Sequence, residues 1–322
     1  MDGDYTRFWL KLFMWGWVVK VCLGVLVYIL IIVLSPVYLR SVNNVKPDRV
    51  DILESCQLPA DEKETFIIFL SGINSRCDGT VYNYMGFEHI RRQLARVGLS
   101  YMDEHFLMYS YTGGKVKGGC WIPNPYKPLD TGQPIQLSVM QLREMIEEFS
   151  SYHPRAKFLL VGHSLGGRIA FDYVTMYQSG RAGQGPIKGL ITLNSPLTGT
   201  PYTQVVFMAA VKPIWGAPAV RQLAAEYQLR NETGIQKNKI NAARRLTSEG
   251  VYLATFGTRQ DIIVPPISAC LTDKQGHPLT KGQIVSVSGF PGNFYELLGH
   301  RQILKHEQVA KSIIYIYTNP EV

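Results

Sequence analysis

The nine residues LLVGHSLGG, at positions 159–167, lead from an apolar segment into a histidine and a serine flanked by glycines. The apolar run at 157–162 predicts a buried strand, and the spacing of apolar residues at 165–178 predicts a helix. Ser164 then lies on the turn between them, at the carboxyl end of a strand, where open α/β sheets bind ligands. Gly162 and Gly166 flank it at minus two and plus two, where a side chain would collide with so tight a turn.

This arrangement is the G-x-S-x-G nucleophile elbow, which exposes a serine hydroxyl for attack on a substrate. The helix that follows Ser164 points backbone N–H groups and a positive dipole end toward a developing oxyanion. The alternative is a glycine-rich turn in which the serine is incidental, because the five-residue pattern also occurs by chance. The predicted strand before the motif and the predicted helix after it favour the nucleophile.

The rest of the chain after residue 64 alternates strands with helices. Continuous apolar strands between amphipathic helices predict a mostly parallel sheet that is covered on both faces. We expect strands at 65–72, 105–114, 157–162, 187–196, 250–257 and 283–289, and helices at 87–98, 134–152, 165–178 and 307–318.

With these elements in place, residues 65–318 resemble a lipase or esterase of the α/β-hydrolase superfamily. The motifs that carry the resemblance are FLSGINS (69–75), GHSLGG (162–167), LNSPLTGTP (193–201), RQDIIVPP (259–266) and GHRQIL (299–304). The resemblance implies an α/β-hydrolase fold and a catalytic triad in the chain order Ser, Asp, His.

A serine hydroxyl is a weak nucleophile that needs a base, and the base needs an orienting carboxylate. The family places the acid on the loop after a late strand, which implies Asp261, with Asp273 as the fallback. Two histidines, His300 and His306, remain as the base, and the family's Gly-His loop before the last helix favours His300.

The oxyanion hole should use two backbone N–H groups. One belongs to Leu165, the residue after the nucleophile, and the resemblance implies Ile73 for the other, with Asn74 next to it. Ser71 stands where the family usually has histidine. This is a departure from the pattern, although a backbone donor does not require that side chain.

The N-terminus predicts a membrane anchor. From Leu12 to Leu39 the only charge is Lys20, and aromatic residues lie near both ends. A helix needs about 20 apolar residues to cross about 30 Å of hydrocarbon, and Lys20 can extend toward the head groups. The rival interpretation, a cleaved signal peptide, expects a shorter apolar run and a small-x-small cleavage site. Basic residues flank both ends, so the side of the membrane that holds the catalytic domain is not predicted.

We therefore divide the chain into an anchor at 1–40, a connector at 41–64 and a hydrolase domain at 65–322. About 50 residues separate the strand that ends in LNSPLTGTP from the strand at 250–257. They include apolar stretches at 204–220 and 219–230, in the place where the family inserts a lid. A lid at 200–248 and an ordinary pair of core-packing helices are both compatible with this pattern.

The composition of the chain argues against several other classes of protein. A hydrophobic content of 46% and a charged content of 18% argue against disorder. The net charge of +8 is dispersed rather than clustered, so nucleic acid is not an expected partner. The five cysteines are odd in number and widely spaced, which argues against a zinc site or a disulfide framework and favours buried free thiols. The alternative is one bridge among Cys56, Cys77, Cys120 and Cys270, if that part of the chain faces an oxidising compartment. No metal or organic cofactor is implied.

These observations together predict a single-pass membrane serine hydrolase that cleaves carboxylic esters, with lipids as the expected substrates. Two alternatives stay open. An acyltransferase or thioesterase would use the same triad with another acceptor or leaving group, and a catalytically silent hydrolase fold would serve as a binding module at the membrane.

Overall fold

The computed structural model describes residues 65–80, 86–178, 185–201, 213–261, 263–272, 277–278, 280–287 and 299–319. All of them fall within one compact unit of the chain. The expected anchor at 12–39, the connector at 41–64 and the fallback Asp273 lie outside these residues. Within the described ranges, no helix is both long enough and apolar enough to cross a membrane.

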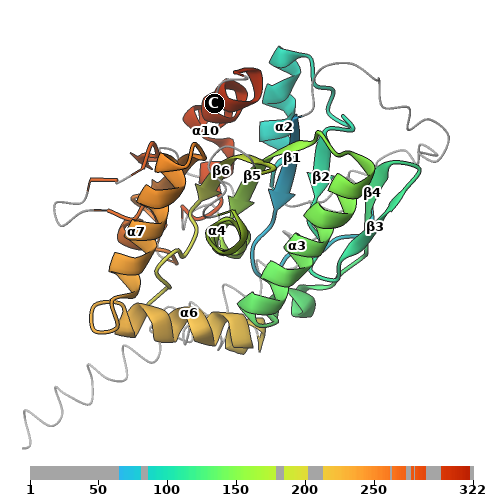
Figure 1. Cartoon of the computed structure of the whole chain (residues 1–322). Helices are drawn as coiled ribbons and strands as arrows, with labels where there is room; N and C mark the ends of the chain where they lie inside the picture. The colour runs from blue at the N-terminus through green and yellow to red at the C-terminus, as the bar shows by residue number, and fades with distance from the viewer. Residues whose placement is uncertain are drawn as a thin grey trace, which may run out of the picture. The chain divides into compact units, whose positions relative to one another are not determined.

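A parallel sheet of six strands forms the centre of this unit (Figure 1). Its order is β2-β1-β5-β6-β7-β8, and each neighbouring pair is parallel. The sheet therefore confirms the predicted α/β architecture with a mostly parallel central sheet. The strands span Thr65–Leu70 (β1), Phe106–Met108 (β2), Lys157–His163 (β5), Ile187–Leu193 (β6), Tyr252–Thr258 (β7) and Ile284–Val285 (β8).

Alternate side chains of each strand enter different cores on the two faces of the sheet. In β1, Phe66 and Ile68 join the core beneath α3, α4 and α7, whereas Ile67 and Phe69 join the core beneath α2 and α10. This burial on both faces explains why the strands are apolar throughout. The helices span Glu88–Leu94 (α2), Ile135–Tyr152 (α3), Leu165–Tyr177 (α4), Ile235–Ser248 (α7) and Glu307–Thr318 (α10).

The predicted strand at 105–114 is wrong in its second half. Strand β2 ends at Met108, and Gly114–Lys117 (β3) instead pairs with Cys120–Pro123 (β4) in a separate antiparallel hairpin. Lys117 pairs with Cys120 across Gly118 and Gly119, which both have positive φ angles of 60° and 82°. Two residues with positive φ form the tight turn that hairpins prefer, so the Gly-Gly pair was the signal in the sequence.

The excursion between β6 and β7 contains more helix than we expected. Helix α6, Pro218–Leu229, corresponds to the predicted stretch at 219–230, but α7 was not predicted. The buried face of α7 consists mainly of Ala242, Ala243 and Leu246, which gives only a weak apolar pattern. In Figure 1, α6 crosses the side of the sheet toward which the strands point. Residues 202–212, which include most of the other predicted apolar stretch, lie outside the described ranges.

The cysteines differ in part from the expectation. Cys77 and Cys270 are buried free thiols, and burial is the main factor that raises the pKa of Cys77 to about 11 and that of Cys270 to about 12. Cys120 is disulfide-bonded, so the expectation of free thiols fails for that residue.

Candidate active site

The elbow has the geometry that its sequence predicts. Ser164 directly follows β5 and occupies the N-cap position of α4 with φ 55° and ψ −127°, a backbone conformation that non-glycine residues rarely adopt. Its N–H donates to the carbonyl of Leu193 on the neighbouring strand at 2.9 Å, which ties the turn to the sheet. The structure thus places a strained serine at the carboxyl edge of the sheet, and strain of this kind concentrates at functional sites.

The glycines of the elbow are required by close backbone approach. A Cβ atom on Gly162 would lie 2.3 Å from the Cα of Gly167, and one on Gly166 would lie 2.2 Å from the carbonyl oxygen of Leu70. Gly167, whose role we did not predict, faces the hydroxyl of Ser195, which would lie 2.0 Å from an added Cβ. All three distances are far below van der Waals contact, so any side chain would displace the turn.

Asp261 and His300 meet although 39 residues separate them. His300 Nδ1 lies 2.7 Å from Asp261 Oδ2, and both side chains are buried. The other oxygen, Oδ1, accepts the backbone N–H groups of Ile263 at 2.8 Å and Val264 at 3.0 Å. An ionised carboxylate can only accept, so Nδ1 of His300 must carry the proton and Nε2 is left as the basic nitrogen.

The elbow histidine holds the loop that carries His300. The Nε2–H of His163 donates to the backbone carbonyl of His300 at 2.9 Å, and the two rings lie 4.9 Å apart. Burial, followed by the charge of a protonated His300, holds the pKa of His163 well below its ordinary value of 6.5. His163 is therefore a neutral donor at pH 7, and its hydrogen bond positions the backbone of His300.

Asn194 joins the loops of the acid and the base. Its Nδ2 donates to the carbonyl of His300 at 3.0 Å, to the carbonyl of Gly299 at 3.3 Å and to Thr258 Oγ1 at 3.0 Å. Its Oδ1 accepts the N–H of Thr258 at 2.8 Å. We did not predict a role for Asn194, because it lay inside the strand expected at 187–196, whereas β6 ends at Leu193. Its φ of 45° is tolerated better by asparagine than by most residues.

The loop after β1 lies against the nucleophile. A Cβ atom on Gly72 would lie 2.6 Å from the Cβ of Ser164. Tyr111 fixes this loop because its buried hydroxyl donates to the carbonyl of Ser71 at 2.8 Å. The N–H of Asn74 is already bound to Thr131 Oγ1 at 2.9 Å, which leaves Ile73 as the better of the two predicted donors in this loop.

The structure does not connect all of the predicted site residues by hydrogen bonds. No hydrogen bond links Ser164 to the imidazole of His300 among the described residues, and catalytic hydrogen bonds often tighten only when substrate binds. His306, the alternative base, caps α10: its Nδ1 accepts the N–H of Gln308 at 3.3 Å. In the part of the chain that the structure describes, no cluster of His, Cys, Asp or Glu is arranged to hold a metal ion.

A second cluster of charged side chains begins one turn into α4. The guanidinium of Arg168 binds Glu226 of α6 through two hydrogen bonds of 2.5 and 3.0 Å, and its Nε donates to Asp172 at 2.8 Å. Lys239 of α7 pairs with the other oxygen of Asp172. Burial opposes ionisation of Asp172, but the charges of Arg168 and Lys239 outweigh it and hold its pKa below the ordinary value. This cluster ties α6 and α7 to the elbow helix.

A family model described as the alpha/beta hydrolase fold matches residues 60–276. Since this is more than half of the 322 residues, the chain belongs to the alpha/beta hydrolase fold family. The matched segment contains Ser164 and Asp261 and ends before His300. No curated protein matches the chain.

Solved structures are similar in fold at low sequence identity. The mature lipase BlEst2 from Bacillus licheniformis is 14% identical, with a TM-score of 0.50 over 83% of this chain and 96% of that one. The lin2722 gene product from Listeria innocua is 13% identical, with a TM-score of 0.43 over 80% and 94% of the two chains. A lipase-esterase related protein from Clostridium acetobutylicum is 8% identical, with a TM-score of 0.42 over 79% and 95%.

Proposed function

We propose that this protein is a serine hydrolase that cleaves carboxylic esters through an acyl-enzyme, with Ser164, His300 and Asp261 as the triad. The observation that carries the proposal is the buried contact of 2.7 Å between His300 Nδ1 and Asp261 Oδ2, on a loop that His163 ties to the elbow. An imidazole oriented by a carboxylate, on a loop tied to the elbow of Ser164, supports the proposal because activation of a serine hydroxyl requires an oriented base.

The proposed reaction has two balanced steps. In the first, Ser164 Oγ attacks the acyl carbon while His300 Nε2 takes the hydroxyl proton, and the carbonyl oxygen becomes an oxyanion. The N–H groups of Ile73 and Leu165 bind that oxyanion. The intermediate collapses, the ester C–O bond breaks, and the alcohol leaves with the proton from His300. In the second step water attacks the acyl-enzyme by the same route, which releases the carboxylic acid and restores Ser164.

A test of this proposal compares ester hydrolysis by the protein and by a Ser164→Ala variant. We expect loss of turnover with the fold intact, because a triad without its nucleophile retains only the catalysis of the oxyanion hole and substrate binding. Ser151→Ala, at an exposed position in the last turn of α3, is the matched control. Substantial turnover by Ser164→Ala would place the nucleophile elsewhere. Thioesters and alcohol acceptors in the same assay separate hydrolysis of esters from thioesterase or acyl-transfer activity.

The membrane part of the proposal rests on the sequence of residues 12–39. We propose that this segment anchors the hydrolase domain to a membrane and that the substrates are lipids of that membrane. Deletion of residues 1–40 should give a soluble hydrolase that remains active on short esters, because every proposed site residue lies beyond residue 65. If the shortened chain cannot fold, the segment packs on the domain and the anchor is contradicted.

A further inference from the structure

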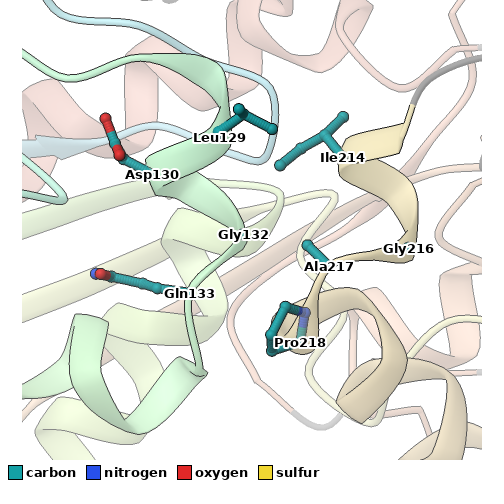
Figure 2. A pocket seen from close by; sticks show the side chains of 8 residues that line it. All are labelled: Leu129, Asp130, Gly132, Gln133, Ile214, Gly216, Ala217 and Pro218. Atoms are coloured by element: carbon teal, nitrogen blue, oxygen red, sulfur yellow. The ribbon is translucent and has the colours of Figure 1, made fainter.

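A pocket of about 450 Å³ lies between two 3₁₀ helices, Pro128–Gly132 (η3) and Pro213–Gly216 (η4). Its volume falls within the range of about 300 to 1,000 Å³ that is usual for small-molecule sites. One wall belongs to the segment before α3 and the other to the excursion between β6 and β7. The residues that line it are Leu129, Asp130, Gly132, Gln133, Ile214, Gly216, Ala217 and Pro218 (Figure 2).

The side chains that face into this pocket are apolar. Figure 2 shows Leu129 and Ile214 pointing toward each other across it, whereas Asp130 and Gln133 point away. The amide of Gln133 donates to the carbonyl of Tyr111 and to Ser138 Oγ, both at 3.0 Å. The carboxylate of Asp130 accepts the N–H of Lys127 at 2.7 Å. Both polar side chains thus bond within the protein, and the side chains that remain to contact a ligand are apolar.

The pocket is joined to the nucleophile by two short contacts. Gly72 lies against Ser164, and two residues further along Asn74 donates its N–H to Thr131 Oγ1 at 2.9 Å. Thr131 stands between Asp130 and Gly132, which both line the pocket. The loop that is proposed to bind the oxyanion therefore connects the serine directly to one wall of the pocket.

The other wall continues into the loop of the catalytic acid. Ile214 belongs to a buried apolar cluster with Ile263 and Val264, which follow Asp261, and Ile73 packs against the same cluster. At the rim, the side chain of Leu129 is 71% exposed and is therefore accessible to a ligand. Apolar packing thus connects Ile214 in the pocket wall to the loop after Asp261 and to Ile73 in the loop after β1.

We propose that this pocket binds the acyl chain of the ester that Ser164 cleaves, an inference that rests on the proposed function. The acyl carbon must lie at Ser164 with its oxygen at Ile73 and Leu165. Its chain leaves the reacting centre beside the loop Ser71–Asn74, and the pocket is the apolar volume to which that loop leads. The substrate class is accordingly esters of aliphatic carboxylic acids whose chains are long enough to reach Leu129.

Two variants test the pocket with p-nitrophenyl acetate, butyrate, octanoate and palmitate as substrates. Ala217→Leu should fill the pocket, because the walls already approach so closely that a Cβ on Gly132 would lie 2.5 Å from Ala217 Cβ. Leu129→Ser should remove the apolar rim at an exposed position, with little effect on folding. Leu229→Ser, at the other end of α6 and 43% exposed, is the matched control.

For the unaltered protein, kcat/KM should rise from acetate to octanoate by a factor of about four for each methylene group that becomes buried. Ala217→Leu should lower the octanoate value by about tenfold or more, equivalent to losing two buried methylene groups, and leave the acetate value within about twofold. Leu129→Ser should also lower kcat/KM for octanoate. Leu229→Ser should leave the dependence of kcat/KM on chain length unchanged.

The results distinguish this inference from the proposed function. If the protein hydrolyses acetate through Ser164 but both pocket variants retain the octanoate-to-acetate ratio, the pocket assignment is overturned and the triad stands. If no ester is hydrolysed and Ser164 resists a fluorophosphonate, the proposed function fails and takes the assignment with it. Loss of acetate hydrolysis in Ala217→Leu would indicate misfolding, and Leu129→Ser then decides the question.

Discussion

Two buried groups of charged side chains are associated with the beginning of α4, and they are built differently. In the Arg168 cluster, each carboxylate faces a cation and the guanidinium has acceptors on two elements, so the charges neutralise one another. In the Asp261–His300 pair, Asp261 is fully bonded, but Nε2 of His300 has no hydrogen-bond partner within the described ranges. Charged side chains whose hydrogen bonds are all made within the cluster hold helices together. An imidazole that is held by one nitrogen keeps its other nitrogen, Nε2, available for proton transfer.

The largest expected effect separates the two histidines that the sequence left as candidates. His300→Ala should lower kcat by about four orders of magnitude, on the scale of other triad members. His306→Ala should leave kcat close to that of the unaltered protein and cost about 1 kcal/mol of stability, because it removes a helix cap. Steady-state kinetics with urea unfolding of both variants provide the measurement, and a reversed pattern in kcat would transfer the base to His306.

The next effect concerns the saturated cluster. Arg168→Met should lower the free energy of unfolding by about 3 to 5 kcal/mol, because it leaves the buried carboxylate of Asp172 and the half-buried carboxylate of Glu226 without their main partner. Arg143→Met is the control, since Arg143 pairs with Glu147 on the exposed face of α3 and its loss should not measurably change stability. Equal unfolding midpoints for the two variants would show that the buried cluster contributes no stability.

A smaller effect should appear at Asn194, which bonds to the loops that carry Asp261 and His300. Asn194→Ala removes the donors to Gly299 and His300, and a shift of the imidazole by about 1 Å can cost about 100-fold in rate. We expect kcat to fall by about 10- to 100-fold with KM changed less than about twofold. Asn194→Asp, which keeps the shape but loses the donors, should also lower kcat. Unchanged kcat in a variant that is merely less stable would make Asn194 a structural residue only.

The smallest effect is the pH dependence that His163 contributes to stability. Its pKa is lowered by burial, so below the ordinary value of 6.5 the unfolded chain binds a proton that the folded chain does not. The free energy of unfolding should therefore fall as pH drops below 6.5, by up to about 1.4 kcal/mol per pH unit. His163→Gln keeps a donor for the carbonyl of His300 but cannot titrate. Urea unfolding between about pH 5 and 8 should show a shallower dependence in this variant, and parallel curves would exclude His163 as the source.

The sequence predicts best what is local. Gly162, Ser164 and Gly166 lie within five residues, and the sterics of that turn are readable from the letters alone. The apolar pattern also predicts α10 at its observed bounds, because a helix has one repeating face. For the hairpin at 114–123 the signal was present in Gly118–Gly119, but the apolar run before it suggested one long strand.

Long-range contacts were not predictable in the same way. The pairing of Asp261 with His300 came from a family resemblance rather than from spacing. Asn194 acts on residues 64 and 106 positions away, and Arg168 binds Glu226 across 58 residues. The residues next to Asn194 and Arg168 in the sequence do not indicate these partners. The partners depend on how β6 and β7 pack together and on where the segment between them, which contains α6, lies in the fold. Such contacts need the fold before they can be assigned.

Covalent trapping tests the central claim most directly. The full-length protein is treated with a fluorophosphonate, digested, and the modified peptide is identified by mass spectrometry. The proposed triad predicts a single modified residue, Ser164, with labelling abolished in Ser164→Ala and strongly slowed in His300→Ala while His306→Ala labels normally. A folded protein that resists the reagent, or one that carries the label on another residue, would contradict the assignment of Ser164 as an activated nucleophile.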